Sequence, residues 1–373
     1  MSPLVIDLRN AEDTRDVVHR AVQALAEGHL VAFPTETVYG VAASALDESA
    51  VERLAAMKRR RESRPLTLAV KSADDALDFV PHMGPLAERL ARRCWPGPVT
   101  LVIHDDHPDS LLTQLPPGVR EAVVPAGEVG LRVPAHSTVL EVLRLMAGPL
   151  VLSSANRAGE PAALTAQGVV DALGAEVPLV LDDGRSRFGQ PSTVVRVRDR
   201  ELELLRPGVV SEQALRRLSS FFVLFVCTGN TCRSPMAEAL FRQLAAERLQ
   251  CKPEELLDRG VWTMSAGLSA MSGGSASPEA IAVLNAAGLS LADHASQPLT
   301  AQLVHHADLI YSMTQAHRQA IVAQWPEVAW RTHLLRIDGG DISDPIGGPS
   351  EEYARCAEQI REHLARRVAE MEF

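Results

Sequence analysis

A short loop between Cys227 and Arg233 has the residue types needed to hold an anion beside a nucleophile. The preceding residues 221–226 (FFVLFV) are apolar and predict a buried strand that ends at the cysteine. Five residues separate Cys227 from Arg233, so backbone N–H groups can surround a tetrahedral oxyanion while the guanidinium binds two of its oxygens. A helix expected over residues 235–244 would direct its positive end at the same anion. We therefore expect Cys227 to be a reactive thiolate.

Three further residues of this loop suit the same chemistry. Asn230, like the preceding glycine, tolerates the left-handed backbone that an inward-turned loop requires. Ser234 can donate a hydrogen bond to the thiolate or to the departing thiol. Cys232 could pair transiently with Cys227 and protect it from irreversible oxidation. The alternative is a structural cysteine that is simply buried at a strand end. A zinc site is disfavoured because no second Cys/His pair has zinc-finger spacing. We therefore expect no metal bound by protein ligands.

A phosphocysteine intermediate also needs an acid that protonates the leaving group and then activates water. Asp344, which is followed by proline in residues 341–348 (DISDPIGG), is the candidate. In isolation an Asp-Pro pair is more often a turn.

Taken together, these segments resemble the low-molecular-weight protein tyrosine phosphatase family over about residues 222–370. The matching segments are residues 227–235 (CTGNTCRSP), 265–267 (SAG), 294–296 (HAS), 308–314 (DLIYSMT) and 344–345 (DP). Tyrosine phosphatases of the family usually carry Ile or Leu before the second cysteine, whereas Thr231 resembles the bacterial protein arginine phosphatases. Ile346 cannot stack on a phenol ring as the usual aromatic residue can. The resemblance favours phosphoarginine as substrate, with phosphotyrosine as the competitor.

The length, composition and net charge of the chain limit the number of domains and the class of protein. A length of 373 residues predicts two or three domains, and 46% hydrophobic with 23% charged residues is typical of globular proteins. A net charge of −10 disfavours a protein that coats nucleic acid, although a local basic patch stays possible. The odd count of five cysteines argues against a disulfide framework, and no run suggests a signal peptide or a membrane span. We expect a cytoplasmic protein without membrane association.

The boundary between two domains is expected between residues 212 and 220. Residues 201–208 predict a strand with a turn, residues 211–218 predict a short helix, and Phe221 opens the next strand. We therefore expect domains over residues 1–212 and 220–373. In the first, a helix is expected over residues 14–28, with strands over 29–34, 66–70, 99–103, 149–153, 177–181 and 192–197. This alternation predicts a mixed α/β domain, followed by a three-layer α/β domain with a parallel sheet.

Polar clusters at the ends of these strands occur in an order that resembles the YrdC-like family of threonylcarbamoyl-AMP synthases, over about residues 10–210. The matching segments are residues 34–40 (PTETVYG), 58–60 (KRR), 95–100 (WPGPVT), 132–134 (RVP), 154–156 (SAN), 191–195 (PSTVV) and 206–208 (RPG). The resemblance implies formation of threonylcarbamoyl-AMP from L-threonine, bicarbonate or CO2, and ATP. This is the first step of threonylcarbamoyladenosine formation in tRNA, so tRNA is an indirect partner through the downstream transfer machinery.

The resemblance also implies roles for individual residues. Lys58 and Arg60 would bind the triphosphate together with Mg²⁺. Ser154 and Asn156 would hold the α-phosphate or the adenylate, and Arg132 could pair with a carboxylate. The remaining candidates are Thr35 and Ser192, which would orient threonine, and Arg206, which belongs to the ATP- and threonine-binding set.

Together, the two halves predict a bifunctional enzyme that acts on small substrates in one domain and on a phosphoprotein in the other. One alternative is an N-terminal domain without catalysis that binds double-stranded RNA or a nucleotide beside an active phosphatase. Another is a second domain that acts as a redox sensor through Cys227 and Cys232.

Overall fold

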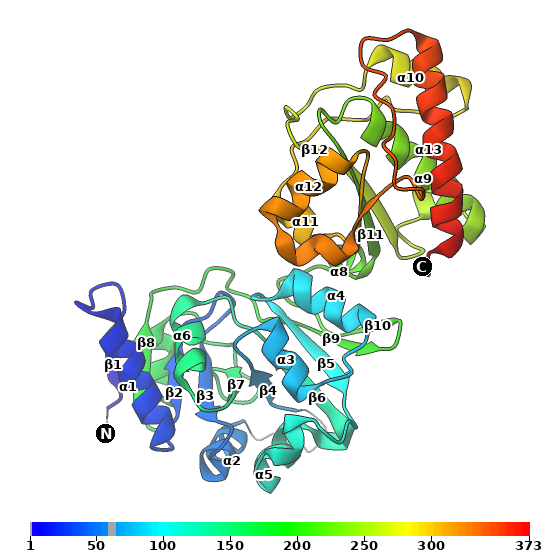
Figure 1. Ribbon diagram of the computed structural model, residues 1–373. Helices are drawn as coiled ribbons and strands as arrows, with labels where there is room; N and C mark the ends of the chain where they lie inside the picture. The colour runs from blue at the N-terminus through cyan, green and yellow to red at the C-terminus, as the bar shows by residue number, and fades with distance from the viewer. Residues whose placement is uncertain (1, 59–64) are drawn as a thin grey trace. The chain divides into compact units, whose positions relative to one another are not determined.

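The computed structural model describes residues 2–58 and 65–373. The chain divides into two compact units, Met1–Leu215 and Arg216–Phe373 (Figure 1). Helix α8 (Glu212–Ser219) spans the division. The residues 213–219, which we expected to lie between the two domains, are therefore helical. Among the described residues, no helix combines the length and apolar character that a membrane crossing requires.

The first unit is built on a ten-stranded mixed sheet with the order β1-β8-β2-β3-β7-β4-β6-β5-β9-β10. Its strands are β1 (Leu4–Asp7), β2 (Val31–Phe33), β3 (Gly40–Ser44), β4 (Thr67–Ala69), β5 (Val99–His104), β6 (Glu128–Arg132), β7 (Leu150–Ser154), β8 (Leu179–Asp182), β9 (Thr193–Arg198) and β10 (Glu201–Arg206). Its helices are α1 (Thr14–Ala26), α2 (Glu48–Met57), α3 (Ala73–Phe79), α4 (Pro85–Cys94), α5 (Pro117–Val123), α6 (Ser137–Leu145) and α7 (Ala166–Leu173), with 3₁₀ turns at Leu111–Gln114 and Pro125–Gly127.

The predicted helix and strands of this unit are present with shifts of one to a few residues at their ends. In α1, Val18, Ala21 and Leu25 recur at helical spacing and are buried, and Asp13 caps the first turn through its side chain. The sequence reasoning missed β1, β3 and β6. Residues 34–39 form no helix or strand after β2 and bend at 36–38, so the polar segment that follows this strand is a loop.

The second unit has four parallel strands in the order β12-β11-β13-β14, which confirms the predicted parallel sheet. Its strands are β11 (Phe221–Cys227), β12 (Val261–Gly267), β13 (Leu309–Ser312) and β14 (Thr332–Leu334). Its helices are α9 (Arg233–Leu249), α10 (Pro278–Ala286), α11 (Ala301–His306), α12 (Gln315–Gln324) and α13 (Ser350–Glu370), with 3₁₀ turns at Pro253–Glu255 and Pro326–Arg331.

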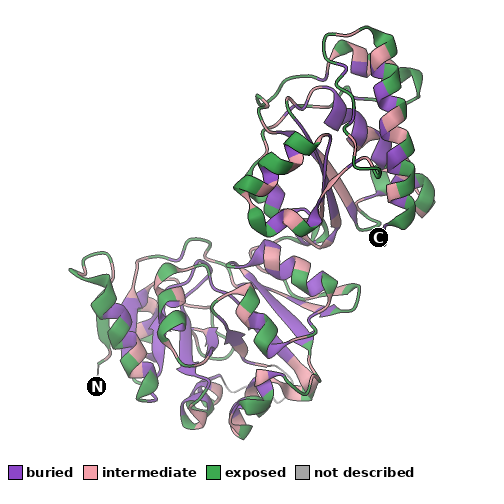
Figure 2. Cartoon of the chain, viewed as in Figure 1, coloured by how far each residue is buried: buried purple, intermediate pink, exposed green. Residues whose placement is uncertain are grey.

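Strand β11 is apolar on both faces because both are covered by helices (Figure 2). Val223 and Phe225 belong to the core under α9, α10 and α13, whereas Leu224 and Val226 belong to the core under α11 and α12. Successive side chains of a strand point to opposite faces, so Cys227 continues the row on the α9 side. The fold therefore places the thiol at the carboxyl end of an inner strand, next to the start of α9.

Candidate active sites

The loop after β11 is held from outside through its carbonyl groups. The carbonyls of Cys227, Thr228 and Thr231 accept hydrogen bonds from the backbone N–H groups of Leu268, Ser269 and Ser277, each at 2.9 Å, and the carbonyl of Asn230 lies 2.8 Å from Nε2 of His294. In a trans peptide the C=O and the next N–H point in opposite directions. The N–H groups of residues 228, 229, 231 and 232 are therefore turned to the other side of the loop. Within the described chain they donate to no protein acceptor, which leaves four donors for an anion.

Asn230 fixes the shape of this loop. Its φ of 56° is in the left-handed region, as the sequence predicted, and its side chain is fully buried. Its amide nitrogen donates to the Oγ atoms of Ser234 and Ser265, each at 2.9 Å, and its Oδ1 accepts the backbone N–H of Gln297 at 2.9 Å. One side chain thus joins the loop to α9, to β12 and to the segment before α11.

The sulfur of Cys227 lies inside this arrangement. Ser234 Oγ is 3.0 Å from Cys227 Sγ, and the backbone N–H of Asn230 donates to the same sulfur at 3.2 Å. Ser234 Oγ accepts from the Asn230 side-chain amide, and its own proton has two acceptors within reach, the sulfur at 3.0 Å and the carbonyl of Ala266 at 3.4 Å, of which the sulfur is the nearer. Both donors stabilise negative charge on sulfur, which is the arrangement a nucleophilic thiolate requires.

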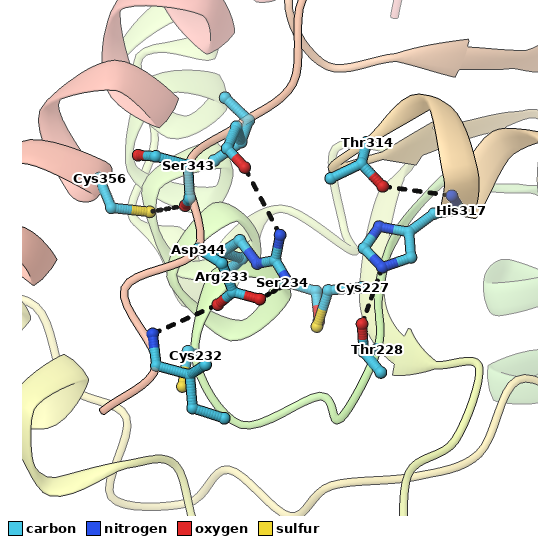
Figure 3. A network of polar contacts seen from close by, with 12 residues as sticks. Cys227, Thr228, Cys232, Arg233, Ser234, Thr314, His317, Ser343, Asp344 and Cys356 are labelled. Carbon is cyan, nitrogen blue, oxygen red and sulfur yellow. Dashed lines mark hydrogen bonds and ion pairs between the residues drawn. The ribbon is translucent and has the colours of Figure 1, made fainter. Parts of the chain in front are cut away.

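Arg233 and Asp344 meet at the mouth of the loop. The buried guanidinium of Arg233 donates through Nη2 to Oδ2 of Asp344, and its Nη1 lies 3.5 Å from the carbonyl of Ile342 (Figure 3). The Asp344 side chain is 45% exposed, so it can exchange protons with water and with a bound substrate. Its Oδ1 accepts the backbone N–H of Ile346, whose side chain is 70% exposed. The structure therefore brings the predicted acid to the predicted nucleophile loop.

Cys232 lies on the outer side of the loop among hydroxyl groups. Its sulfur is 3.4 Å from Ser277 Oγ, 3.5 Å from the hydroxyl of Tyr353 and 3.6 Å from Oγ1 of Thr231. All five cysteines are in the described part of the chain and are free. The transient pairing of Cys232 with Cys227 stays a prediction.

Some residues of this site escaped the sequence reasoning. His317, in the first turn of α12, places Nε2 2.8 Å from Oγ1 of Thr228. Burial, and then the nearby Arg233, lower the pKa of His317 below its ordinary value. Ser265 and His294 were noticed only within matching segments, without a role. His317 lies 89 positions from Thr228 in the sequence, so no local pattern could have indicated their contact.

A second site lies in the first unit, in a pocket at the ends of several strands. Five of the predicted binding residues line it, namely Thr35, Arg132, Ser154, Ser192 and Arg206. They come from the loop after β2, from β6 and β7, from the segment before β9, and from the end of β10. The fold therefore gathers into one pocket residues that are up to 171 positions apart, from 35 to 206.

Lys58 and Asn156 border this pocket through Ser154. The buried Lys58 Nζ donates to the carbonyl and Oδ1 of Asn156 at 2.6 and 2.8 Å, and lies 3.4 Å from Ser154 Oγ. Ser154 Oγ also donates to Asn156 Oδ1 at 2.6 Å. Lys58 follows α2 directly, so it is not a solvated helix end. Arg60 lies outside the described residues.

Arg132 already has a carboxylate partner within the protein. Its Nη2 donates to Oε1 of Glu36 at 2.6 Å and to Oγ1 of Thr37 at 3.0 Å, and both members of the ion pair are only 7% exposed. Glu36 Oε2 also accepts the backbone N–H of Ala135 at 3.0 Å. The sequence reasoning expected Arg132 to pair with a carboxylate but did not identify Glu36. Because Nε and Nη2 are engaged in protein contacts, the orientation of the guanidinium is set before any ligand binds.

Two predicted hydroxyl residues, Ser192 and Thr35, also line this pocket. Arg206 Nη2 donates to the carbonyl and Oγ of Ser192 at 2.8 and 3.0 Å, and Ser192 Oγ is 3.0 Å from Oγ1 of Thr100. Thr35 Oγ1 donates to the carbonyl of Val38 at 2.6 Å. Among the described residues, no cluster of three or more His, Cys, Asp or Glu side chains could hold a metal ion.

Comparisons with known proteins assign both units. The family model described as "Telomere recombination" (Sua5, YciO and YrdC) matches residues 23–208, and the model described as low molecular weight phosphotyrosine protein phosphatase matches residues 222–372. A putative threonylcarbamoyl-AMP synthase of Mycobacterium leprae is 36% identical over 207 residues, which are 56% of this chain and 90% of that protein. A protein-arginine-phosphatase of Bacillus subtilis is 38% identical over 146 residues, which are 38% of this chain and 91% of that protein.

Longer relatives are matched only in part. The chain spans about half the length of the threonylcarbamoyl-AMP synthase of Pyrococcus abyssi, at 37% identity over 184 residues, 49% of this chain and 51% of that protein. A solved structure of P. abyssi Sua5 has a TM-score of 0.51 at 24% identity and covers 71% of this chain and 91% of that chain, which supports the fold alone. The chain therefore belongs to two families, with a Sua5/YciO/YrdC domain in its N-terminal part and a low molecular weight phosphotyrosine protein phosphatase domain in its C-terminal part.

Proposed function

We propose that the chain is a bifunctional enzyme, a threonylcarbamoyl-AMP synthase joined to a cysteine-dependent protein phosphatase. The observation that carries the second activity is the set of four unpaired amides of the loop after Cys227, with the sulfur inside the loop and Arg233 and Asp344 at its mouth. The first activity is supported by the pocket that unites five predicted ligand-binding residues, and by relatives that carry the synthase name.

In the proposed phosphatase reaction, the Cys227 thiolate attacks the phosphorus atom of a phosphoresidue. A phosphorus–sulfur bond forms while the bond to the leaving group breaks, and Asp344 gives the leaving group a proton. Arg233 and the inward amides compensate the negative charge on the phosphoryl oxygens. In the second step water attacks the phosphocysteine, Asp344 takes a proton from it, and the thiolate leaves with Ser234 and the Asn230 amide as donors.

The proposed protein substrate carries phosphoarginine. Support comes from Thr231 before the second cysteine, from the exposed aliphatic Ile346 beside Asp344, and from the similarity to the B. subtilis arginine phosphatase. Phosphate release from a phosphoarginine peptide and a phosphotyrosine peptide of the same sequence tests this, with Cys227→Ser as the inactive control. Faster release from phosphotyrosine would refute the assignment of the substrate while leaving the cysteine chemistry intact.

In the proposed synthase reaction, L-threonine and bicarbonate or CO2 form a carbamate whose oxygen attacks the α-phosphorus of ATP, and pyrophosphate leaves. Lys58 and Arg60 would bind the triphosphate, while Ser154 and Asn156 would hold the α-phosphate. Thr35 and Ser192 would orient threonine beside Arg132 and Arg206. Positioning supplies the rate, because the reaction needs no covalent enzyme intermediate.

Mg²⁺ would bind in this pocket through the phosphate oxygens of ATP and not through a set of protein ligands. The pocket offers hydroxyl groups and cations, and the carboxylate of Glu36 is committed to Arg132, so the protein groups suit phosphate oxygens. Mg²⁺ would supply charge neutralisation of the phosphates. The adenylate would serve tRNA threonylcarbamoylation, with both activities in the cytoplasm.

Pyrophosphate release that depends on both ATP and threonine tests the synthase. The competing hypothesis is an N-terminal unit that only binds nucleotide or double-stranded RNA. Nucleotide or RNA binding without pyrophosphate release, in a chain whose phosphatase is active, would support that alternative and reject the synthase.

A further inference from the structure

Thr228 and His317 form a pair that the reaction described above does not use. Thr228 directly follows Cys227 and is exposed, whereas His317 is buried in the first turn of α12, whose N-cap is Thr314 (Figure 3). The two side chains meet at 2.8 Å between Thr228 Oγ1 and His317 Nε2. The carbonyl of Thr228 is held separately by Ser269, so the pair adds a side-chain restraint to the first residue of the anion loop.

The surroundings of His317 decide which atom donates. Burial and the positive charge of Arg233 lower the pKa of His317, against the weaker opposite effect of Asp344 and Asp341 on the loop before α13, so the ring is neutral at pH 7. A neutral imidazole has one N–H and one bare nitrogen. Nδ1 is buried and has no partner in the described part of the chain. Buried N–H groups without acceptors are rarer than acceptors without donors, so the proton belongs on Nε2, which donates to Thr228.

This assignment leaves the proton of the Thr228 hydroxyl for another acceptor. A hydroxyl donates one hydrogen and accepts through two lone pairs. Oγ1 of Thr228 uses a lone pair on His317, and no other described protein atom lies in hydrogen-bond contact with it. The same residue contributes one of the inward amides next to the sulfur.

We propose that Thr228 is a further substrate-binding residue of the phosphatase site, whose hydroxyl donates to an oxygen of the phosphoryl group, and that His317 is the positioning residue that directs this proton. The inference rests on the proposed phosphatase function. Because the ligand is the tetrahedral oxyanion and not the leaving group, the contribution should be the same for phosphoarginine and phosphotyrosine substrates.

Matched substitutions separate this role from simple packing. Thr228→Val keeps the shape and removes the hydroxyl, while Thr228→Ser keeps the hydroxyl. His317→Gln keeps an N–H at the reach of Nε2, while His317→Asn keeps only a shorter amide. We expect kcat/KM to fall about tenfold in Thr228→Val and in His317→Asn, the usual loss for one hydrogen bond to a charged group, with both peptides. Thr228→Ser and His317→Gln, which keep the hydroxyl and the N–H, should recover most of the kcat/KM that Thr228→Val and His317→Asn lose.

The double variant Thr228→Val/His317→Asn should be no slower than Thr228→Val alone, since both remove the same interaction. Losses that multiply, or Gln and Asn variants that are equally impaired, would overturn the role of His317. A Thr228→Val variant with the parent kcat/KM would overturn the role of Thr228.

A second measurement needs no turnover. Iodoacetate alkylation of Cys227, followed by mass spectrometry, reports whether inorganic phosphate occupies the loop. We expect phosphate to protect the parent chain, and protection of Thr228→Val to require about tenfold more phosphate. Equal protection of both would reject the proposal even if neither peptide were hydrolysed. Absence of turnover with this expected shift would count against the proposed phosphatase activity and not against the Thr228 contact.

Discussion

Lys58 donates from Nζ to both the backbone carbonyl and the side-chain Oδ1 of Asn156, at 2.6 and 2.8 Å. The lysine comes from the end of α2 and the asparagine from the loop after β7, and the contact fixes a buried cation next to Ser154 of the pocket. These backbone and amide oxygens hold the ammonium group in place beside the pocket of the first unit. We therefore treat Lys58 as a cation whose position is set before a phosphate binds.

The first prediction concerns this lysine. Lys58→Ala should lower the rate of ATP- and threonine-dependent pyrophosphate release by about 100-fold or more, since a preorganised donor at a developing charge is lost. Phosphate release by the second unit should not change. Cys227→Ser is the reciprocal control, with intact pyrophosphate release and no phosphatase activity. Equal pyrophosphate release from Lys58→Ala and the parent chain would contradict the role of Lys58.

A second prediction concerns the buried ion pair of Glu36 and Arg132. Glu36→Gln removes the charge that compensates a guanidinium with only 7% exposure, and leaving one member of such a pair unpaired costs about 3 kcal/mol. We expect the free energy of unfolding of the first unit to fall by this order, measured in urea by hydrogen exchange of the strands of its sheet.

The double variant Glu36→Gln/Arg132→Met tests the cause of that loss. With no buried cation left, it should regain stability relative to Glu36→Gln, while pyrophosphate release should be lost because the guanidinium is gone. A double variant that is less stable than Glu36→Gln would show that Arg132 contributes through packing and not through charge.

What the sequence could predict depended on whether the signal was local. The nucleophile loop could be predicted because its functional residues, Cys227, Asn230, Arg233 and Ser234, lie within eight positions of the sequence. The backbone conformation that this loop requires is also determined by these few residues. The pocket of the first unit was found only through the order of its segments. Glu36 as the partner of Arg132, 96 positions away, and His317 as the partner of Thr228 are created by the fold.

The missed strands have a similar explanation. Strand β3 (GVAAS) is completely buried but consists mainly of glycine, alanine and serine, which have little intrinsic preference for strands. Its position between β2 and β7 comes from tertiary packing. The strands that were predicted, such as β5 (VTLVIH) and β9 (TVVRVR), are rich in β-branched residues.

A third prediction separates the backbone and side-chain roles of Asn230. Asn230→Gly keeps the left-handed backbone and removes the side-chain hydrogen bonds, whereas Asn230→Ala also adds about 1 kcal/mol of backbone strain at a φ of 56°. Both should lose phosphatase activity, because Ser234 is no longer oriented toward the sulfur. The Ala variant should be the less stable of the two in urea denaturation of the second unit. An Ala variant as stable as the Gly variant would contradict the inferred strain.

The last prediction concerns acid stability of the second unit. Burial lowers the pKa of both His317 and His333, and the positive charges of Arg233 for the first and of Arg367 for the second add to the effect. Unfolding returns each ring to its ordinary pKa, so below about 6.5 the unfolded chain binds more protons than the folded chain. The stability is therefore present above this pH and is lost as the pH falls through it, with a slope of at most about 1.4 kcal/mol per pH unit for each histidine.

Tryptophan fluorescence in urea is a suitable measurement, because Trp262, Trp325 and Trp330 are in this unit and only Trp95 is in the other. We expect the free energy of unfolding to decrease from about pH 7.5 to about pH 5.5, and the decrease to be shallower in His317→Gln, which cannot take up a proton. The decrease should also be shallower in His333→Gln, which removes the second histidine whose pKa is lowered by burial. Identical slopes in the parent chain and in His317→Gln would show that His317 is not held neutral by its surroundings.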